Sequence, residues 1–354
     1  MTPETLIVLS PGFPGDESES TCLPAQQMFL RKLKQLHPGM RIIVCAFQYP
    51  FVKKEYDWFG IEVISFDGRN RGKLYRRLLW WRILKRLAPV MTHGNIVGIL
   101  SFWLGDCALV GRRLSDRYHT RHLTWLLGQD VKKGNKYFYS VKPGADQLVA
   151  ISDFTSDQLF ENYGVQPSFI IPIGIDPEEF PTDEYKRSVD VLGVGSLIAL
   201  KRFELFIDIV ASLKKKHPSL KAVICGKGPE KERLVQKIQS CGLGETIRLM
   251  DEIPHDKVLE LMKKSKLLLH TSEYESFSSV SYEALYAGCS VVSFVKPMKN
   301  PLEHFYYVEN KDVAVDAITD ILTKESNYTA VSPYMAKDAA KRMMEVLRNQ
   351  EIAR

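Results

Sequence analysis

The 354-residue sequence predicts an α/β protein with two Rossmann-like domains, each built on a parallel sheet. Short runs of Val, Ile and Leu alternate with helical stretches along the chain, which is typical of parallel strands covered on both faces. The runs fall into two groups, separated by an acidic, proline-containing stretch without apolar periodicity. The length is sufficient for two domains of ordinary size.

The apolar runs place the expected strands in order. The first group covers residues 6–9, 41–46, 62–65, 96–101, 123–127, 148–151 and 169–171, and the second covers 189–194, 221–225, 246–249, 267–270 and 289–294. We therefore place the first domain at 1–176, a linker at 177–189 and the second domain at 190–334. A late helix at 335–354 carries Met343, Val346 and Leu347 in helical register.

Composition excludes several classes of protein. The chain is 45% hydrophobic and 25% charged, as in ordinary globular proteins. No apolar run approaches the roughly 20 residues of a membrane span. The six cysteines lack CxxC spacing, so we expect reduced thiols in a cytoplasmic protein, without a zinc site or a disulfide framework.

The net charge of +6 is concentrated between residues 69 and 86, where basic residues and Trp80 and Trp81 occur with no acid among them. One interpretation is a patch that docks on the anionic inner face of the plasma membrane. The other is a core-packing helix whose arginines extend to solvent, because helical periodicity spreads the cations over two sides. Nucleic acid is less favoured as a partner, because the charge excess is small and no recognition motif occurs.

In the segment 270–292, the carboxylates Glu275 and Glu283 are separated by seven residues. An apolar strand precedes Glu275, so this residue is expected in a loop at the carboxyl end of a strand, with Glu283 on the next helix. Ligands of parallel sheets bind at that end. A helix amino terminus offers N–H groups to phosphates, and carboxylates accept from sugar hydroxyls. The ordinary alternatives are a solvated Glu283 and a Glu275 that complements the helix dipole.

This segment resembles the E-x7-E signature of the retaining enzymes of glycosyltransferase family 4. Similar family motifs occur in the family's order at residues 10–15, 127–130, 149–152, 171–176, 194–201, 224–229 and 253–258. The resemblance implies the GT-B fold, in which two Rossmann-like domains face each other across a cleft and the last helix crosses back to the first. It also implies metal-independent transfer from a nucleoside-diphosphate sugar, UDP- or GDP-linked, without a further cofactor. The expected acceptor is a hydroxyl in surface polysaccharide or glycolipid synthesis.

The resemblance also implies roles for individual residues. Glu275 contacts the transferred sugar, Glu283 binds the donor ribose, and Lys201 neutralises the leaving diphosphate. Ser196 stands where the family usually has an arginine, so Arg202 is the candidate second cation. The remaining donor-binding candidates lie in loops that border the phosphates or the base: Gly15, Gly226, Gly228, Ile253, Phe277, Ser278, Ser279 and Val280.

Candidates on the acceptor side come from the first domain. The stretch 127–130 matches a family pattern whose histidine is here replaced by leucine. Gln129 and Asp130 remain at the expected strand end, with Asp130 a candidate for proton removal, and Trp103 and Asp106 follow another strand. His122 stands at the opposite end of its strand, so we interpret it as structural.

Three alternative functions are each distinguished by a different feature. The glycines at 193 and 195 resemble a dinucleotide fingerprint, but the next strand ends in Cys225-Gly226 rather than an acid, which argues against NAD. A non-catalytic nucleotide-sugar-binding subunit fits the missing histidine and arginine. An epimerase or phosphorylase on a similar scaffold is distinguished by its products.

Overall fold

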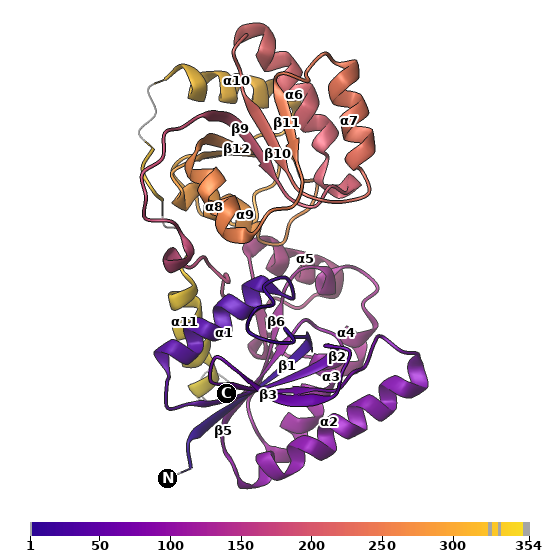
Figure 1. The fold of residues 1–354 in the computed structure, drawn as a ribbon. Coiled ribbons are helices and arrows are strands. Elements are labelled where there is room, and N and C mark those ends of the chain that lie inside the picture. The colour runs from indigo at the N-terminus through magenta and orange to yellow at the C-terminus, as the bar shows by residue number, and fades with distance from the viewer. Residues whose placement is uncertain (1, 325–327, 332–333, 350–354) are drawn as a thin grey trace. The chain divides into compact units, whose positions relative to one another are not determined.

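The structure, a computed structural model, describes residues 2–324, 328–331 and 334–349. The chain forms two compact units, which are described separately (Figure 1). The first unit contains the chain up to Ile173 together with the segment from Ala336, and the second contains Gly174–Met335.

The first unit has an eight-stranded sheet in the order β3-β4-β2-β1-β5-β6-β7-β8. Its strands are β1 (Glu4–Gly12), β2 (Arg41–Tyr49), β3 (Lys54–Trp58), β4 (Ile61–Ser65), β5 (Asn95–Phe102), β6 (His122–Leu126), β7 (Leu148–Ala150) and β8 (Phe169–Ile170). Its helices are α1 (Pro24–Leu36), α2 (Lys73–His93), α3 (Asp106–Tyr118), α4 (Lys136–Val141), α5 (Asp153–Tyr163) and α11 (Ala336–Arg348), with short 3-10 turns at Gln129–Val131 and Ala145–Gln147.

The sheet is parallel except at one edge, where β3 runs antiparallel to β4. The sequence analysis did not predict β3, because its alternating polar residues and five-residue length resemble a loop. Phe59 and Gly60 join the two strands with positive φ angles of 50° and 75°. Two successive residues of this kind form the tight turn whose twist suits a hairpin.

Both faces of this sheet are covered, as expected for near-continuous apolar strands. On one face, Ile7 and Ile43 pack with Leu79, Ile83 and Leu87 of α2. Elsewhere in the unit, α11 packs beside α1 and near β5. Gly98 of β5 permits this packing, because an added Cβ would lie 2.7 Å from Leu347. The end of the expected helix, 350–354, lies outside the described residues.

The second unit has a wholly parallel six-stranded sheet in the order β11-β10-β9-β12-β13-β14. Its strands are β9 (Val189–Val194), β10 (Ala222–Cys225), β11 (Ile247–Met250), β12 (Ser265–His270), β13 (Ser290–Ser293) and the edge strand β14 (Phe305–Tyr307), which the sequence analysis did not predict. Its helices are α6 (Phe203–Lys216), α7 (Lys231–Ser240), α8 (His255–Lys263), α9 (Ser279–Tyr286) and α10 (Lys311–Thr323), with 3-10 turns at Pro177–Glu179 and Ala199–Lys201.

The segment 177–189, which reads as a linker in the sequence, packs within this second unit. The Arg187 guanidinium donates to the carbonyls of Met262 at 3.0 Å and Ala287 at 2.6 Å. Phe180 packs edge-on against Tyr286, with ring centroids 4.6 Å apart. The acidic residues and prolines of this segment indicated a linker. Its contacts depend on one arginine and one aromatic side chain, which the sequence pattern did not single out.

None of the helices that the structure describes combines the length and the hydropathy of a membrane span.

Candidate active site

The candidate site lies at the carboxyl end of the second sheet, where β9 and β12 are neighbours. This pairing brings Lys201, in the turn after β9, to Glu275, which is 74 residues away along the chain. Backbone and side-chain bonds hold the two loops together. Thr271 Oγ1 donates to the Lys201 carbonyl at 2.8 Å, and the Glu273 N–H donates to the Leu200 carbonyl at 3.0 Å.

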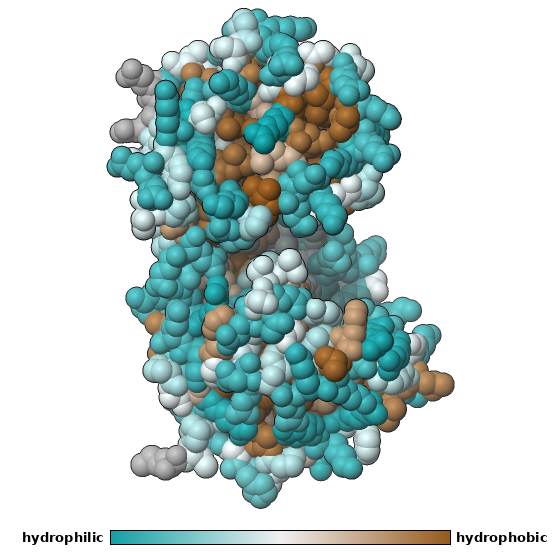
Figure 2. All heavy atoms as spheres, in the orientation of Figure 1, coloured by the Kyte–Doolittle hydropathy of each residue, from teal (hydrophilic) through white to brown (hydrophobic). Residues whose placement is uncertain are grey.

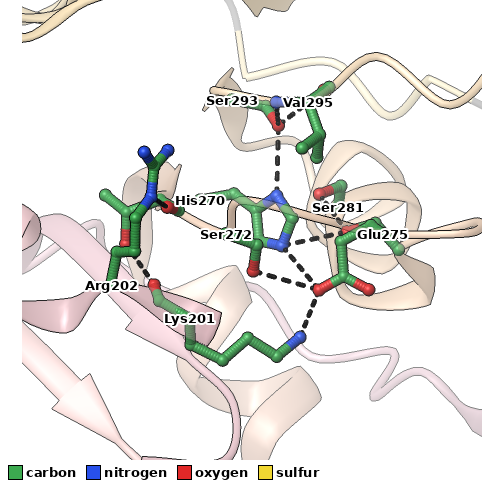
Figure 3. Close-up of polar contacts among 10 residues, drawn as sticks. Lys201, Arg202, His270, Ser272, Glu275, Ser281, Ser293 and Val295 are labelled. Atoms are coloured by element: carbon green, nitrogen blue, oxygen red, sulfur yellow. Dashed lines mark hydrogen bonds and ion pairs between the residues drawn. The ribbon is translucent and has the colours of Figure 1, made fainter. Parts of the chain in front are cut away.

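The Glu275 carboxylate is the centre of this site (Figure 3). Its Oε1 atom forms an ion pair with Lys201 and accepts from Ser272 Oγ at 3.0 Å. His270 Nε2 lies 3.4 Å from the same oxygen. Burial disfavours the charged form, but the His270 contact and the Lys201 charge outweigh it and lower the pKa of Glu275 to about 2. The structure thus brings together Glu275 and Lys201, which the sequence analysis selected.

His270 is a site residue that the sequence analysis did not single out. It is the last residue of β12, and it is almost fully buried. Its Nδ1 atom lies 3.1 Å from Ser293 Oγ, and its Nε2 atom lies 3.3 Å from Ser278 Oγ. Burial lowers the pKa of His270 below its usual range. A histidine at the end of an apolar strand carries little signal by itself, because its partners lie on other elements.

The loop between Glu275 and α9 is shaped by Ser278, whose φ of 62° is left-handed. Its hydroxyl lies 2.8 Å from Ser281 Oγ. Phe277 is buried and stacks on Tyr282, with ring centroids 4.5 Å apart. The Phe277 side chain therefore belongs to the core, which leaves only its backbone for a ligand. Ser279 begins α9, so its N–H and that of Val280 are in the first turn, where a helix attracts anions.

Glu283 lies on α9, as predicted, and contacts a histidine of the 253–258 motif that was given no role in the sequence analysis. His255 Nε2 is 3.1 Å from Glu283 Oε1, and His255 Nδ1 is 3.6 Å from Glu179 Oε2. The hydrogen bond to Glu283 raises the pKa of His255, and burial opposes this shift. Glu283 is thus a half-buried acceptor with one titratable partner.

The structure places Arg202 away from the role expected of it. Its Nε donates to the Thr271 carbonyl at 2.8 Å, and its guanidinium lies 5.2 Å from the ring centroid of Phe294. In Figure 3 the guanidinium points away from the Glu275 carboxylate. Arg202 joins the two loops through its hydrogen bond to Thr271, and its left-handed φ of 49° turns the chain at the start of α6. Ser196 is exposed in the turn after β9.

Gly226 and Gly228 permit close packing of the loops that follow β9 and β10. A Cβ on Gly226 would lie 1.9 Å from the Gly195 carbonyl oxygen, and one on Gly228 would lie 2.3 Å from that of Leu197. The Leu197 N–H donates to the Lys227 carbonyl at 2.9 Å. These glycines are therefore needed to hold the loops together. Ile253 is half-buried in the loop after β11.

In the first unit, Asp130 is a buried carboxylate that fixes loops. It accepts N–H groups from Leu104 at 2.9 Å, Gly128 at 2.8 Å and Leu127 at 3.2 Å. Burial raises the pKa of Asp130, and these backbone donors oppose the shift. A buried carboxylate occupied in this way is suited to holding two strand ends, rather than to the proton removal that the sequence analysis considered. Gln129 beside it is exposed.

Asp106 also has structural partners. It is the first residue of α3, and its Oδ1 accepts from Tyr137 Oη at 2.5 Å and Trp80 Nε1 at 3.1 Å. The carboxylate thus joins α2, α3 and α4. Trp103, just beyond β5, is half-buried with a left-handed φ of 64°, which is an unusual conformation for a bulky residue.

Gly15 and His122 are the remaining residues of the first unit for which the sequence predicted a role. The Gly15 N–H, expected to face donor phosphates, donates to the Glu19 carboxylate at 2.6 Å. His122 is buried with its Nε2 2.9 Å from Ser101 Oγ, and burial lowers its pKa to about 3. Its position agrees with the structural role that the sequence analysis gave it.

Two family models match the chain. The family described as glycosyl transferases group 1 matches residues 175–354, and the one described as glycosyltransferase family 4 matches residues 28–179.

Curated relatives match part of the chain. The phosphatidylinositol N-acetylglucosaminyltransferase GPI3 subunit of Saccharomyces cerevisiae is 25% identical over 242 residues, covering 61% of this chain and 53% of the relative. A human phosphatidylinositol N-acetylglucosaminyltransferase subunit is 30% identical over 152 residues, covering 42% of this chain and 31% of the relative. A glycogen synthase of Mycobacterium tuberculosis is 24% identical and covers 49% of this chain and 43% of its own. The chain thus spans about half the length of these relatives or less.

Solved structures match nearly the whole chain. Anabaena HepE in complex with UDP and glucose gives a TM-score of 0.65 at 17% identity, covering 99% of this chain and 98% of its own. Sucrose-phosphate synthase from Thermosynechococcus elongatus gives 0.67 at 14% identity, covering 99% and 96%. This likeness shows that the fold is of the GT-B type.

Proposed function

The chain belongs to the glycosyl transferases of group 1, and from this premise we propose that it transfers a sugar from a nucleoside-diphosphate donor to a hydroxyl acceptor with retention of configuration. The observation that carries the proposal is the ionised Glu275 paired with Lys201 at the carboxyl end of a parallel sheet. That edge is where parallel α/β sheets bind ligands.

The donor is bound by the second unit. Glu283 accepts hydrogen bonds from the ribose hydroxyls, and the first turn of α9 faces the diphosphate with its N–H groups. Lys201 neutralises charge on the leaving diphosphate. Because a diphosphate carries more negative charge than one carboxylate, it competes with Glu275 for the Lys201 ammonium.

The donor is a UDP-sugar in this proposal. Anabaena HepE has been crystallised with UDP and with UDP-glucose, and pneumococcal GtfA with UDP and GlcNAc. Thermal-shift measurements with UDP, GDP and ADP test this choice, because a ligand that binds only the folded state raises the melting temperature. A rise in melting temperature with GDP and none with UDP would show that the donor carries guanine instead of uracil.

In the transfer step, the acceptor oxygen forms a bond to the anomeric carbon while the bond from that carbon to the phosphate oxygen breaks. Both events occur on the same face of the sugar. The acceptor proton passes to the departing phosphate oxygen, so the step requires no protein base. Positioning and electrostatic stabilisation then supply the rate enhancement. NMR of the first-formed product tests the stereochemistry, and inverted product would exclude this route.

The proposal includes independence of divalent metal. We expect transfer to continue in excess chelator, because Lys201 and backbone N–H groups meet the diphosphate charge. Initial rates with a chelator and after addition of Mg²⁺ or Mn²⁺ test this point. A strict cation requirement would contradict it.

The acceptor is proposed to lie at a membrane surface, and α2 is the docking element. Leu74, Leu78 and Trp81 are 83%, 43% and 55% exposed. Their spacing of four and three residues puts them on one face of the helix. Figure 2 shows hydrophobic atoms among hydrophilic ones at the outer end of α2, at the lower right.

The basic residues of α2 divide into two sets, which explains their spread around the helix. Arg76 donates to Tyr137 Oη at 2.8 Å, and Arg86 binds both oxygens of Glu55 at 2.8 and 2.7 Å. Within the described parts of the chain, Lys73, Arg77 and Lys85 are exposed and have no carboxylate within 4.0 Å; they are the cations that flank the apolar stripe. Cations beside an exposed apolar stripe favour an anionic lipid surface.

Vesicle sedimentation tests the docking face. We expect binding to vesicles of phosphatidylcholine with phosphatidylglycerol, and much weaker binding to phosphatidylcholine alone. The double substitution Leu74→Ser and Trp81→Ser should abolish it. Phe160→Ser on α5 is the matched control, because Phe160 is 53% exposed. Unchanged binding of the double variant would remove α2 from the proposal.

A non-catalytic nucleotide-sugar-binding subunit is less favoured, because relatives of this chain include transferases and synthases. A purified chain that binds nucleotide but neither transfers nor hydrolyses sugar would restore this alternative. Product analysis separates an epimerase, which would change the donor sugar itself.

A further inference from the structure

The His270 ring connects two strands to the candidate catalytic carboxylate. It stands at the end of β12 with only 5% of its surface exposed. Ser293, at the end of β13, faces Nδ1 at 3.1 Å, while Glu275 Oε1 faces Nε2 at 3.4 Å (Figure 3). The ring therefore lies between a hydroxyl fixed by the sheet and a carboxylate in a loop.

The partners of His270 determine where its proton lies. Burial keeps the ring neutral at pH 7, so only one ring nitrogen carries hydrogen. An ionised carboxylate is acceptor-only, which places the hydrogen on Nε2, toward Glu275. Nδ1 then faces Ser293 Oγ, whose hydroxyl also reaches the Val295 carbonyl at 2.8 Å. His270 is consequently a neutral, directional donor whose orientation is set by the strand next to its own.

The donors to Glu275 converge on one oxygen. Lys201, Ser272 and His270 all contact Oε1. Within the described residues, no donor is found for Oε2, which the arrangement leaves for a ligand. Lys201 is the one donor of the three that carries a charge at pH 7 and is also expected to meet the donor diphosphate.

Binding of the nucleotide-sugar therefore changes what holds Glu275. When the diphosphate draws the Lys201 ammonium, the carboxylate loses its strongest partner. Ser272 and His270 remain, and of these only the His270 ring is braced on its far side by another element. A carboxylate stabilises a developing charge less well if its orientation varies.

We propose that His270 is a positioning residue, which holds the Glu275 carboxylate in a fixed orientation while Lys201 is engaged by the donor diphosphate. This inference rests on the proposed function for its kinetic consequence. The groups that act on Glu275 electrostatically, among the described residues, are Lys201 and His270.

Two substitutions separate positioning from packing. His270→Leu removes both nitrogens and keeps an apolar side chain of similar bulk, whereas His270→Gln keeps an N–H donor near the Nε2 position. We expect kcat of His270→Leu to fall roughly 10- to 100-fold, as for loss of one hydrogen bond to a charged group, with KM for the donor nearly unchanged. His270→Gln should recover most of the loss. Equal kcat in wild type and His270→Leu would overturn the proposal.

The pH dependence supplies a readout that a purely structural role would not move. In the wild type the pKa of Glu275 is about 2, so its ionisation places no acid limb above pH 4. Loss of the His270 donor raises the pKa of Glu275, and the acid limb of kcat should move to higher pH in His270→Leu. A uniform loss at every pH, without recovery by glutamine, would assign His270 to packing alone.

His122 provides the matched control, because it is also a buried histidine that contacts a serine hydroxyl. His122→Leu should lower the melting temperature without moving the pH profile of the folded enzyme. If the wild type transfers no sugar, the proposed function fails by itself. A carbon-13 titration of the Glu275 carboxyl in wild type and His270→Leu still decides the inference, and equal pKa values would contradict it.

Discussion

At the carboxyl end of each sheet lies a carboxylate with several donors, Asp130 in the first unit and Glu275 in the second. Asp130 accepts three backbone N–H groups, which belong to the loops that it joins. Glu275 accepts from the side chains of Lys201, Ser272 and His270. Backbone donors are held by the fold, whereas side-chain donors are able to turn toward a ligand.

The two carboxylates also differ in the direction in which their pKa values are shifted. Burial raises the pKa of Asp130, and its three backbone amide partners oppose this shift without cancelling it. The pKa of Glu275 is lowered to about 2 despite burial, because His270 and the Lys201 charge stabilise the ionised form. A carboxylate beside a cation that it shares with a ligand is suited to chemistry. One surrounded by amides is suited to holding loops.

The largest expected effect tests Glu275 itself. Glu275→Gln keeps the shape and removes the charge, and we expect kcat to fall at least roughly 100-fold, as for loss of a preorganised electrostatic group. The Kd for UDP should change less than about 3-fold, because the ribose and base contact other residues. Steady-state kinetics and calorimetry measure the two quantities. Wild-type turnover would remove Glu275 from the site.

Asp130→Asn tests whether the first-unit carboxylate holds loops together. The new amide presents N–H groups to backbone N–H groups, so we expect a loss of about 1–3 kcal/mol in the free energy of unfolding. Activity of the folded fraction should stay within about 3-fold of wild type. Urea unfolding and kinetics at low temperature measure these effects. A stable variant with greatly reduced kcat would instead make Asp130 catalytic.

Glu283→Ala tests donor binding at the same edge of the second sheet. Loss of a charged acceptor for the ribose should weaken UDP binding by roughly 10-fold, with a smaller effect on kcat. Glu260→Ala on α8 is the control, because the described partners of Glu260 are Lys257 on the same helix and Lys264 just after its end. Calorimetry with UDP measures both. Equal weakening of UDP binding in Glu260→Ala would indicate a general effect of removing one negative charge.

The smallest effect concerns pH and His255. Its folded-state pKa is raised, chiefly by Glu283, so the contact stabilises the protein below the unfolded-state pKa of about 6.5. This contribution is lost as pH rises through the folded-state value. Because the side chain is 47% exposed, the expected size is about 0.5 kcal/mol. Unfolding of wild type and His255→Asn at pH 5.5 and 9 measures it. A larger difference at pH 9 would reverse the sign.

Apolar strands were predictable, even the short β7 and β8, whereas the polar β3 and the aromatic edge strand β14 were not. β1 and β9 were found because runs of buried Val, Ile and Leu have few other uses in a globular chain. β3 and β14 lie at sheet edges, have five and three residues, and are partly exposed. Such strands depend on a neighbour for their hydrogen bonds, so their own residues carry little signal.

The candidate site shows the same limit. Glu275, Glu283 and Lys201 were selected from spacing and family resemblance, because Glu275 and Lys201 follow recognisable strands and Glu283 lies on the next helix. The contacts of His270 and His255 were not, since their partners are 23 and 28 residues away along the chain. The position of Arg202 also depended on Phe294, which belongs to another element.

By itself, the sequence determined the alternation of strands and helices, the fold class and the strand ends that carry charged residues. These properties follow from local apolar periodicity and from the residue order in short motifs. Only the tertiary structure decided which carboxylate is held by backbone amides and which is held by side chains. The physical reason is that a carboxylate's role depends on the groups within hydrogen-bonding distance, and strand pairing brings those groups together from distant parts of the chain.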